Sequence, residues 1–185
     1  YLLIIVSNQS GIGRGYYSER DLDTLNQAIA EHLDSTLGVT LSGFYHCPHH
    51  PTEAEGEFRQ QCDCRKPAPG MIQQAVLDHG IDVKTSLLVG DKDSDIEAGR
   101  AAGVGRLFKV VDSAQSGASA PDIQFLTAVS EVPSLLYRCR NGRTQITGRG
   151  SRRGHVKTRI QRLQYRRRSA ARLKLWILRH STHDK

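Results

Sequence analysis

Three cysteines and one histidine stand in two close pairs with the spacing of a metal site. Cys47 and His49 are two positions apart, Cys62 and Cys64 are two positions apart, and twelve residues separate the pairs. Thiolate and imidazole ligands in two pairs suit a closed, tetrahedral zinc site, which would make an irregular loop rigid. Buried thiols beside a surface histidine are the alternative, but cysteines seldom cluster so tightly without a bridge or a metal. Two neighbouring histidines compete with His49 for the fourth position.

A glycine-rich segment, residues 7–15 (SNQSGIGRG), follows an apolar run at the start of the chain. Backbone N–H groups freed by the glycines, together with the Ser7 hydroxyl and the Asn8 amide, could cradle a phosphate group. A plain turn explains the glycines equally well. This segment therefore indicates a phosphate site only in combination with other features.

Carboxylates follow another apolar run, in the segment Gly90 to Asp95 (GDKDSD). Asp91 lies directly after the run, where a carboxylate could hold Mg²⁺ that also binds a substrate phosphate. Asp93 and Asp95 fall in the first turn of a predicted helix, and we interpret them as favourable charges at its N-terminus. The sequence therefore predicts a magnesium ligand at Asp91 alone.

Two cations, Arg65 and Lys66, follow Cys64 directly. Whatever fixes the metal loop also fixes these two side chains. Lysine suits a point contact to phosphate and arginine a bidentate one. An exposed cation pair is ordinarily only solvated, so the position beside a metal ligand carries this interpretation.

Apolar runs and helical spacing alternate along the first part of the chain. Strands are predicted at residues 1–6, 39–46, 86–89, 104–111 and 122–126, and helices at 18–37, 69–79 and 93–102. Such alternation predicts a doubly wound α/β sheet of parallel strands. In that fold the loops after the strands build the site. The glycine-rich, Cys/His and Gly-Asp segments all lie in such loops.

Charge divides the chain into two parts. The whole chain has 185 residues and a net charge of +7. Residues 1–137 hold 10 Lys and Arg against 18 Asp and Glu, whereas residues 138–185 hold 16 against one. We therefore predict a domain at 1–137 and a basic tail at 138–185. Leucine, isoleucine and Trp176 give that tail a partial helical stripe from about residue 157.

Composition excludes several protein classes. No apolar run approaches the roughly 20 residues of a membrane span, and no signal peptide precedes the first strand. Four cysteines are too few for a disulfide scaffold. We expect a cytoplasmic monomer that contacts no membrane, and a chain whose true beginning lies before Tyr1.

Taken together, the segments SNQSGIGRG, GFYHCPHHP, CDCRKPAPGM and VGDKDSDIEAG resemble the D,D-heptose 1,7-bisphosphate phosphatases of the haloacid dehalogenase superfamily. The resemblance covers residues 1–137. It implies a three-layer Rossmannoid parallel sheet with a zinc-binding loop, and a phosphatase of lipopolysaccharide-precursor sugars. It also favours His49 over His46 and His50 as the zinc ligand, leaving those two as solvated loop histidines.

The resemblance implies a role for each candidate residue. Ser7, where the family usually has threonine, and Lys66 would stabilise the transferring phosphoryl group. Asp91 would bind catalytic Mg²⁺, beside structural Zn²⁺ on the four cysteine and histidine ligands. The sugar phosphate would be bound by the remaining candidates, which are Asn8, Gln9, Ser10, Arg65 and Lys92.

The family's nucleophile lies in an Asp-x-Asp-Gly motif on a strand before the one that starts at Tyr1, and none of these 185 residues forms that motif. We therefore expect the chain by itself to be inactive and its sheet to expose strand edges.

Two other functions stay open. The first is a histidinol-phosphate phosphatase, because that family shares a zinc loop and the Arg-Lys-Pro segment. The second is a zinc-containing nucleic-acid-binding module that uses the basic tail. Acids in the Cys/His loop, such as Glu53 and Glu55, count against nucleic acid. We favour a tail that is not native to the family, for example an out-of-frame continuation.

Overall fold

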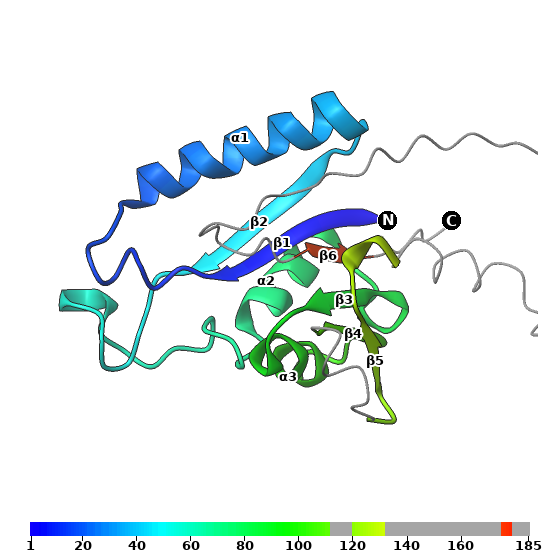
Figure 1. Ribbon diagram of the computed structural model, residues 1–185. Coiled ribbons are helices and arrows are strands. Elements are labelled where there is room, and N and C mark those ends of the chain that lie inside the picture. The colour runs from blue at the N-terminus through cyan, green and yellow to red at the C-terminus, as the bar shows by residue number, and fades with distance from the viewer. Residues whose placement is uncertain (112–119, 132–174, 179–185) are drawn as a thin grey trace, which may run out of the picture. The chain divides into compact units, whose positions relative to one another are not determined.

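The computed structural model describes residues 1–111, 120–131 and 175–178. Their strands form one sheet with the order β2-β1-β6-β3-β4-β5 (Figure 1). Strand pairs β1–β2, β3–β4 and β4–β5 are parallel, as the alternation of strands and helices predicted. The strands are β1 (Leu2–Asn8), β2 (Leu41–Cys47), β3 (Leu87–Gly90), β4 (Arg106–Val110), β5 (Ile123–Leu126) and β6 (Leu175–Leu178).

The longest helix, α1 (Glu19–Leu37), begins and ends as its sequence predicts. The Ser18 side chain accepts a hydrogen bond from the backbone N–H of Asp21, and the Asp21 carboxylate accepts one from the backbone N–H of Ser18. That second bond lowers the pKa of Asp21. At the other end Gly38 adopts φ 64°, a left-handed conformation that ends the helix. Helix α1 packs against β2.

Two shorter helices support the rest of the sheet. Helix α2 (Gly70–His79) packs against β2 and β1, and α3 (Asp93–Ala101) packs against β3 and β4. All four residues of β3 are buried, as expected of a strand covered on both faces. The largest fully buried side chains come from β1, α2, β3, α3 and β4, and they include Ile4, Ile72, Leu88, Ile96 and Phe108. This core fixes the ends of β1 and β3, from which the site loops leave.

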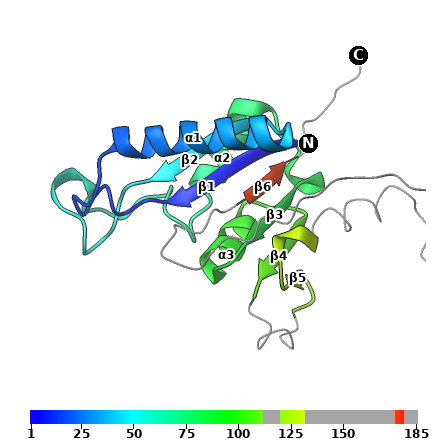
Figure 2. The same ribbon diagram turned by 45° about the horizontal axis from the view of Figure 1, so that its top comes forward.

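Strand β6 lies between β1 and β3 and runs antiparallel to both (Figure 2). Leu3 pairs with Ile177, and Leu87 pairs with the same residue from the other side. The inner edges of β1 and β3, which the sequence analysis expected to be exposed, are therefore hydrogen-bonded. The helical stripe predicted for the tail is wrong at residues 175–178, and the rest of the tail lies outside the described residues.

None of the helices in the described part of the chain combines the length and the apolarity needed to cross a membrane.

Candidate functional site

The site loops leave the sheet at the carboxyl ends of β1, β2 and β3, as the fold class predicts. In the β1–β2 register, Ser7 lies beside His46 and Asn8 beside Cys47. The backbone N–H of Gln9 donates to the Cys47 carbonyl oxygen over 2.8 Å, which continues this pairing past the strand ends. The glycine loop (residues 9–15) and the Cys/His loop (residues 47–65) therefore start side by side.

The four predicted zinc ligands converge on one point. The ligand atoms of Cys47, His49, Cys62 and Cys64 all lie within 4.8 Å of one another. The Cys64 Sγ is 3.0 Å from that of Cys47 and 3.2 Å from that of Cys62, and the His49 Nδ1 is 3.4 Å from the Cys64 Sγ. Zinc–sulfur bonds of about 2.3 Å place sulfurs about 3.8 Å apart in a tetrahedron, so a small outward movement would admit the ion. These residues fit zinc.

The thiols of this cluster differ in acidity. Burial raises the pKa of the Cys47 thiol, and burial likewise raises that of Cys64. Burial also opposes ionisation of Cys62, but hydrogen bonds from Cys64 and Cys47 outweigh it and lower the pKa of Cys62. Mutual hydrogen bonding thus favours one thiolate in the cluster before any metal binds.

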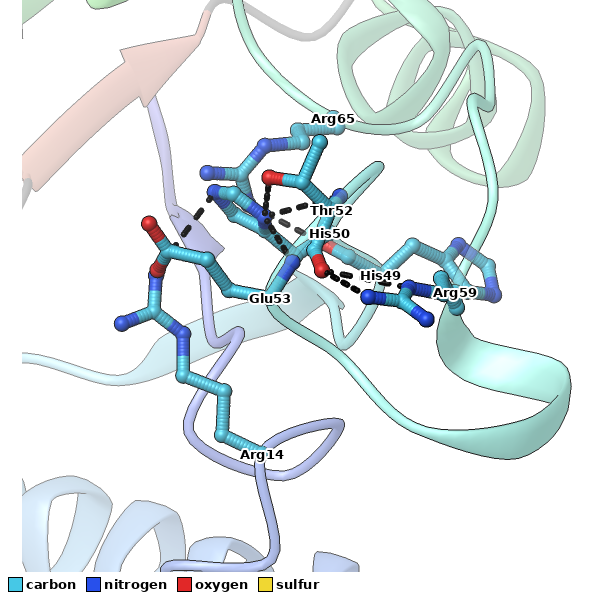
Figure 3. A network of polar contacts seen from close by, with 7 residues as sticks. All are labelled: Arg14, His49, His50, Thr52, Glu53, Arg59 and Arg65. Carbon is cyan, nitrogen blue, oxygen red and sulfur yellow. Dashed lines mark hydrogen bonds and ion pairs between the residues drawn. The ribbon is translucent and has the colours of Figure 1, made fainter.

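Hydrogen bonds between side chains and backbone atoms stabilise the Cys/His loop (Figure 3). Arg65 donates from Nη1 to the His49 carbonyl oxygen (2.9 Å), and Arg59 donates from Nη2 to the Thr52 carbonyl oxygen (2.7 Å). The His50 Nδ1 accepts from the backbone N–H of Glu53 over 3.0 Å. The interpretation of His50 as a solvated histidine is therefore wrong, because its ring closes a turn.

The Cys/His loop is also tied to the glycine loop. Arg14 forms an ion pair with Glu53, drawn in Figure 3, and the backbone N–H of Glu55 donates to the Gly13 carbonyl oxygen over 2.8 Å. A Cβ atom at Gly13 would lie 2.6 Å from the Pro48 carbonyl oxygen and 2.9 Å from the Ala54 Cβ. Glycine at position 13 therefore allows the two loops to touch.

Lys66 lies at the centre of the site. Its side chain has 0% exposure, and its Nζ lies 2.8 Å from the Val6 carbonyl oxygen and 2.8 Å from Asp95 Oδ1. Its backbone N–H donates to Asn8 Oδ1 (3.0 Å), and its carbonyl oxygen accepts from Asn8 Nδ2 (3.1 Å). Lys66 thus joins the end of β1 to the start of α3. The sequence singles out Lys66 but does not predict these partners.

Asp95 is a buried partner of Lys66 that the sequence did not reveal. We interpreted it as a favourable charge at a helix N-terminus, but its side chain is fully buried and paired with Lys66. Its second oxygen, Oδ2, accepts from the backbone N–H of Lys92 over 3.1 Å. Gly90 makes room for it, since a Cβ there would lie 2.4 Å from the Asp95 Cβ. The available signal in the sequence was a carboxylate four residues after Asp91, in a chain that also has a lysine directly after the Cys/His loop.

The remaining candidates directly follow β1 and β3. Asp91 is half-buried directly after β3, and Lys92 is exposed beside it. Asp93 pairs with Lys109 rather than facing the site. Ser10 is half-buried in the turn that the bond from Arg14 N–H to the Ser10 carbonyl oxygen closes. Gln9 faces back to β1, where its Nε2 donates to the Ser7 Oγ over 3.1 Å.

Comparisons with known proteins agree on one family. A family model described as HAD-hydrolase-like matches residues 63–108. The D-glycero-β-D-manno-heptose-1,7-bisphosphate 7-phosphatase of Haemophilus ducreyi is 52% identical over 104 residues, which are 56% of this chain and 57% of the relative. The enzyme of the same name from Vibrio cholerae is 39% identical over 140 residues and 75% of each chain. The chain thus spans about 57% of the first relative's length.

Solved structures share the fold. A HAD-like phosphatase from Mesorhizobium loti superposes with a TM-score of 0.63 at 33% identity, over 72% of this chain and 63% of that one. The D,D-heptose 1,7-bisphosphate phosphatase of B. bronchiseptica, solved with magnesium and phosphate, gives a TM-score of 0.60 at 22% identity, over 73% of each chain. The second likeness is a likeness of fold alone.

Proposed function

The chain belongs to the heptose-1,7-bisphosphate 7-phosphatase family of HAD-like hydrolases, and we propose that the protein containing it hydrolyses D-glycero-D-manno-heptose 1,7-bisphosphate to the 1-phosphate. Relatives carry both the α and the β anomer in their names, so the proposal covers the heptose bisphosphate and leaves its anomer to the experiment.

The position of Lys66 is the observation that carries this proposal. Its ammonium group is fully buried and is directed by the Val6 carbonyl oxygen and by Asp95, so its position at the end of β1 is fixed. A fixed charge costs no reorganisation when negative charge develops on a phosphoryl group, which is the main source of catalysis in phosphoryl transfer. In our proposal Lys66 stabilises the transferring phosphoryl group, and the Ser7 hydroxyl donates to it.

The other candidates would bind the substrate. The Asn8 side chain is hydrogen-bonded to both the backbone N–H and the carbonyl oxygen of Lys66. In our proposal it lines the phosphate pocket together with Gln9 and Ser10. Arg65 is oriented by its bond to the His49 carbonyl oxygen and would recognise the sugar phosphate, with Lys92 as a further cation.

Asp91 would hold the catalytic magnesium ion. A half-buried carboxylate at the end of β3 is the kind of hard oxygen ligand that Mg²⁺ prefers. When bound, the ion would neutralise charge on the phosphoryl oxygens. The solved B. bronchiseptica enzyme was complexed with magnesium and phosphate, which supports this choice of metal. Zinc on the Cys/His cluster would have a structural role only.

The attacking carboxylate would come from outside these 185 residues. In our proposal one aspartate of an Asp-x-Asp-Gly motif attacks phosphorus, and the other gives its proton to the C7 oxygen as the P–O bond breaks. The second aspartate then takes a proton from the water that attacks the aspartyl phosphate, which releases orthophosphate and restores the first carboxylate. The substrate is a small sugar phosphate, and we propose a cytoplasmic, monomeric enzyme.

Orthophosphate release tests the proposal. We would assay the longest natural protein that contains this chain, and separately the 185-residue chain, with Mg²⁺ and both anomers of the heptose bisphosphate. Release from the bisphosphate but not from the heptose 1-phosphate is expected for the longer protein, and no turnover for the shorter chain. Lys66→Gln should lower kcat/KM about 100-fold or more.

Lys84→Gln is the matched control, because Lys84 is an exposed lysine away from the loops of the site. It should leave kcat/KM unchanged. Two results would overturn the proposal: a folded, zinc-loaded longer protein that releases no orthophosphate from either anomer, or one that prefers histidinol phosphate.

A further inference from the structure

A hydrogen-bonded chain of three side chains leads from the surface to Ser7. The Tyr17 hydroxyl donates to the Gln9 Oε1 over 2.7 Å, and the Gln9 Nε2 donates to the Ser7 Oγ over 3.1 Å. Ser7 is the hydroxyl assigned above to the phosphoryl group, whereas Tyr17 lies ten residues later, just before α1. No motif in the sequence points to Tyr17.

We propose that Tyr17 is a positioning residue that sets the direction of the Ser7 proton through the Gln9 amide. An amide has one accepting end and one donating end, so a donor at Oε1 leaves the NH₂ group facing Ser7. A serine hydroxyl that accepts this bond keeps its own proton for another acceptor. In the proposed function, on which this inference rests, that acceptor is a phosphoryl oxygen.

The glycine loop is shaped to hold the Tyr17 ring in place. A Cβ atom at Gly11 would lie 2.3 Å from Cε1 and 2.7 Å from the hydroxyl oxygen of Tyr17. The ring therefore crosses the loop where only glycine leaves space. The backbone N–H of Tyr16 donates to the Gly11 carbonyl oxygen over 2.8 Å, which holds the chain just before Tyr17 against the same residue.

The phenol is suited to the donor role. A tyrosine hydroxyl, with an ordinary pKa of about 10, is protonated at neutral pH, and burial raises the pKa of Tyr17 further. Its neighbour Tyr16 is 73% exposed and has no side-chain hydrogen bond in the described part of the chain. Of these two adjacent tyrosines, only Tyr17 donates to Gln9. Tyr16 is therefore a matched control.

Kinetics of the longer, active protein test the positioning role. Tyr17→Phe removes the donor but keeps the ring, and should lower kcat about tenfold with KM changed less than about twofold, because about 1.4 kcal/mol of transition-state stabilisation is lost. Gly11→Ala should act in the same direction by displacing the ring. Tyr16→Phe should leave kcat unchanged.

A double-mutant cycle with Ser7→Thr distinguishes positioning from mere support of the loop. The β-branch of threonine restricts χ1, so the hydroxyl depends less on Gln9 for its direction. We expect the effect of Tyr17→Phe on kcat to shrink to about twofold or less when it is combined with Ser7→Thr. An equal loss with and without Ser7→Thr, or no loss when Ser7 is retained, would overturn the inference.

A binding-independent readout keeps this test apart from the proposed function. In ¹H–¹⁵N NMR spectra of the 185-residue chain, the Gln9 side-chain amide should exchange slowly, and Tyr17→Phe but not Tyr16→Phe should accelerate that exchange. Unchanged exchange in Tyr17→Phe would overturn the relay even in a protein with full activity. If the hydrogen-bonded chain is intact but the longer protein releases no orthophosphate, the proposed function is rejected and the inference about Tyr17 is not.

Discussion

Two ion pairs link separate segments of the site, and one is buried whereas the other is exposed to water. Lys66 and Asp95 both have side chains with 0% exposure, whereas the side chains of Arg14 and Glu53 are 28% and 54% exposed. The first pair connects the residue directly after the Cys/His loop to α3, and the second connects the glycine loop to the Cys/His loop. Both link segments distant in sequence, but they differ in the water that surrounds them.

That difference decides what each pair contributes. A surface pair gains little, because water and salt screen it, and measured values are about 0–1 kcal/mol. A buried pair is costly to assemble, but removal of one partner leaves a charge without compensation in the interior. The buried pair therefore fixes the position of the Lys66 ammonium group, and the exposed pair only biases the contact between two loops.

Removal of the metal should change stability the most, and it should affect the surroundings of the exposed ion pair but not those of the buried one. Structural zinc sites contribute apparent free energies of about 10–16 kcal/mol, so a chelator should release most of the Cys/His loop. Hydrogen exchange should accelerate at amides of that loop, including Glu55 N–H, which bonds to Gly13. The Lys66 N–H should stay protected, because it bonds to Asn8 rather than to the loop.

The zinc content measured alongside gives the control. The zinc-loaded chain should hold one ion per molecule, and Cys64→Ser should lose it. If hydrogen exchange accelerated equally at the Glu55 and Lys66 amides after chelation, the buried pair would depend on the metal as much as the exposed pair does. That result would contradict the difference drawn between the two pairs.

Asp95→Ala should give the next largest loss. It leaves the Lys66 ammonium buried without its carboxylate, which should lower the free energy of unfolding by about 3–5 kcal/mol. Urea denaturation at neutral pH measures this loss. The matched control is Asp93→Ala in the same helical turn, where the side chain is 79% exposed and paired with Lys109. That substitution should cost about 1 kcal/mol or less, and similar losses for both would contradict the assignment.

Gly13→Ala should have an intermediate effect on the contact between the two loops. A methyl group there would meet the Pro48 carbonyl oxygen at 2.6 Å, so the loops must separate. Overpacking of this kind costs about 1–3 kcal/mol. The control is Gly103→Ala, where a Cβ has open space and the strain comes from a positive φ of 78° alone. Only Gly13→Ala should also weaken zinc retention in a chelator titration.

Local signals in the sequence predicted the fold and the metal cluster well. Ser18 with Asp21 and the terminal Gly38 define α1 because caps act within one turn of a helix. The four metal ligands form two short-range pairs, and their spacing carries the chemistry. The family resemblance supplied Lys66, and in the structure its Nζ lies 2.8 Å from the Val6 carbonyl oxygen in β1 and 2.8 Å from Asp95 Oδ1 in α3.

Contacts made by the tertiary fold could not be predicted in this way. Lys66 and Asp95 are 29 positions apart, and a carboxylate in a first helical turn fits an N-terminal charge equally well. The short apolar run Leu175–Leu178 is compatible with a helix or a strand, and pairing with β1 and β3 decides the outcome. The hydrogen bonds of the His50 ring and of the Tyr17 hydroxyl could not be predicted either, because no sequence pattern marks them.

Glu53→Gln should have the smallest effect, and it completes the comparison. The amide keeps the size of the side chain and the backbone bond to His50 but removes the charge that faces Arg14. The loss in unfolding free energy should be about 0–1 kcal/mol at low salt and should vanish near 1 M NaCl, where the Debye length is about 3 Å. Glu57→Gln, in the same loop and without an ion pair among the described residues, is the control. A salt-independent loss above about 2 kcal/mol would mean that the Arg14–Glu53 pair is shielded from water as Lys66–Asp95 is, and that the loop contact is part of the rigid core.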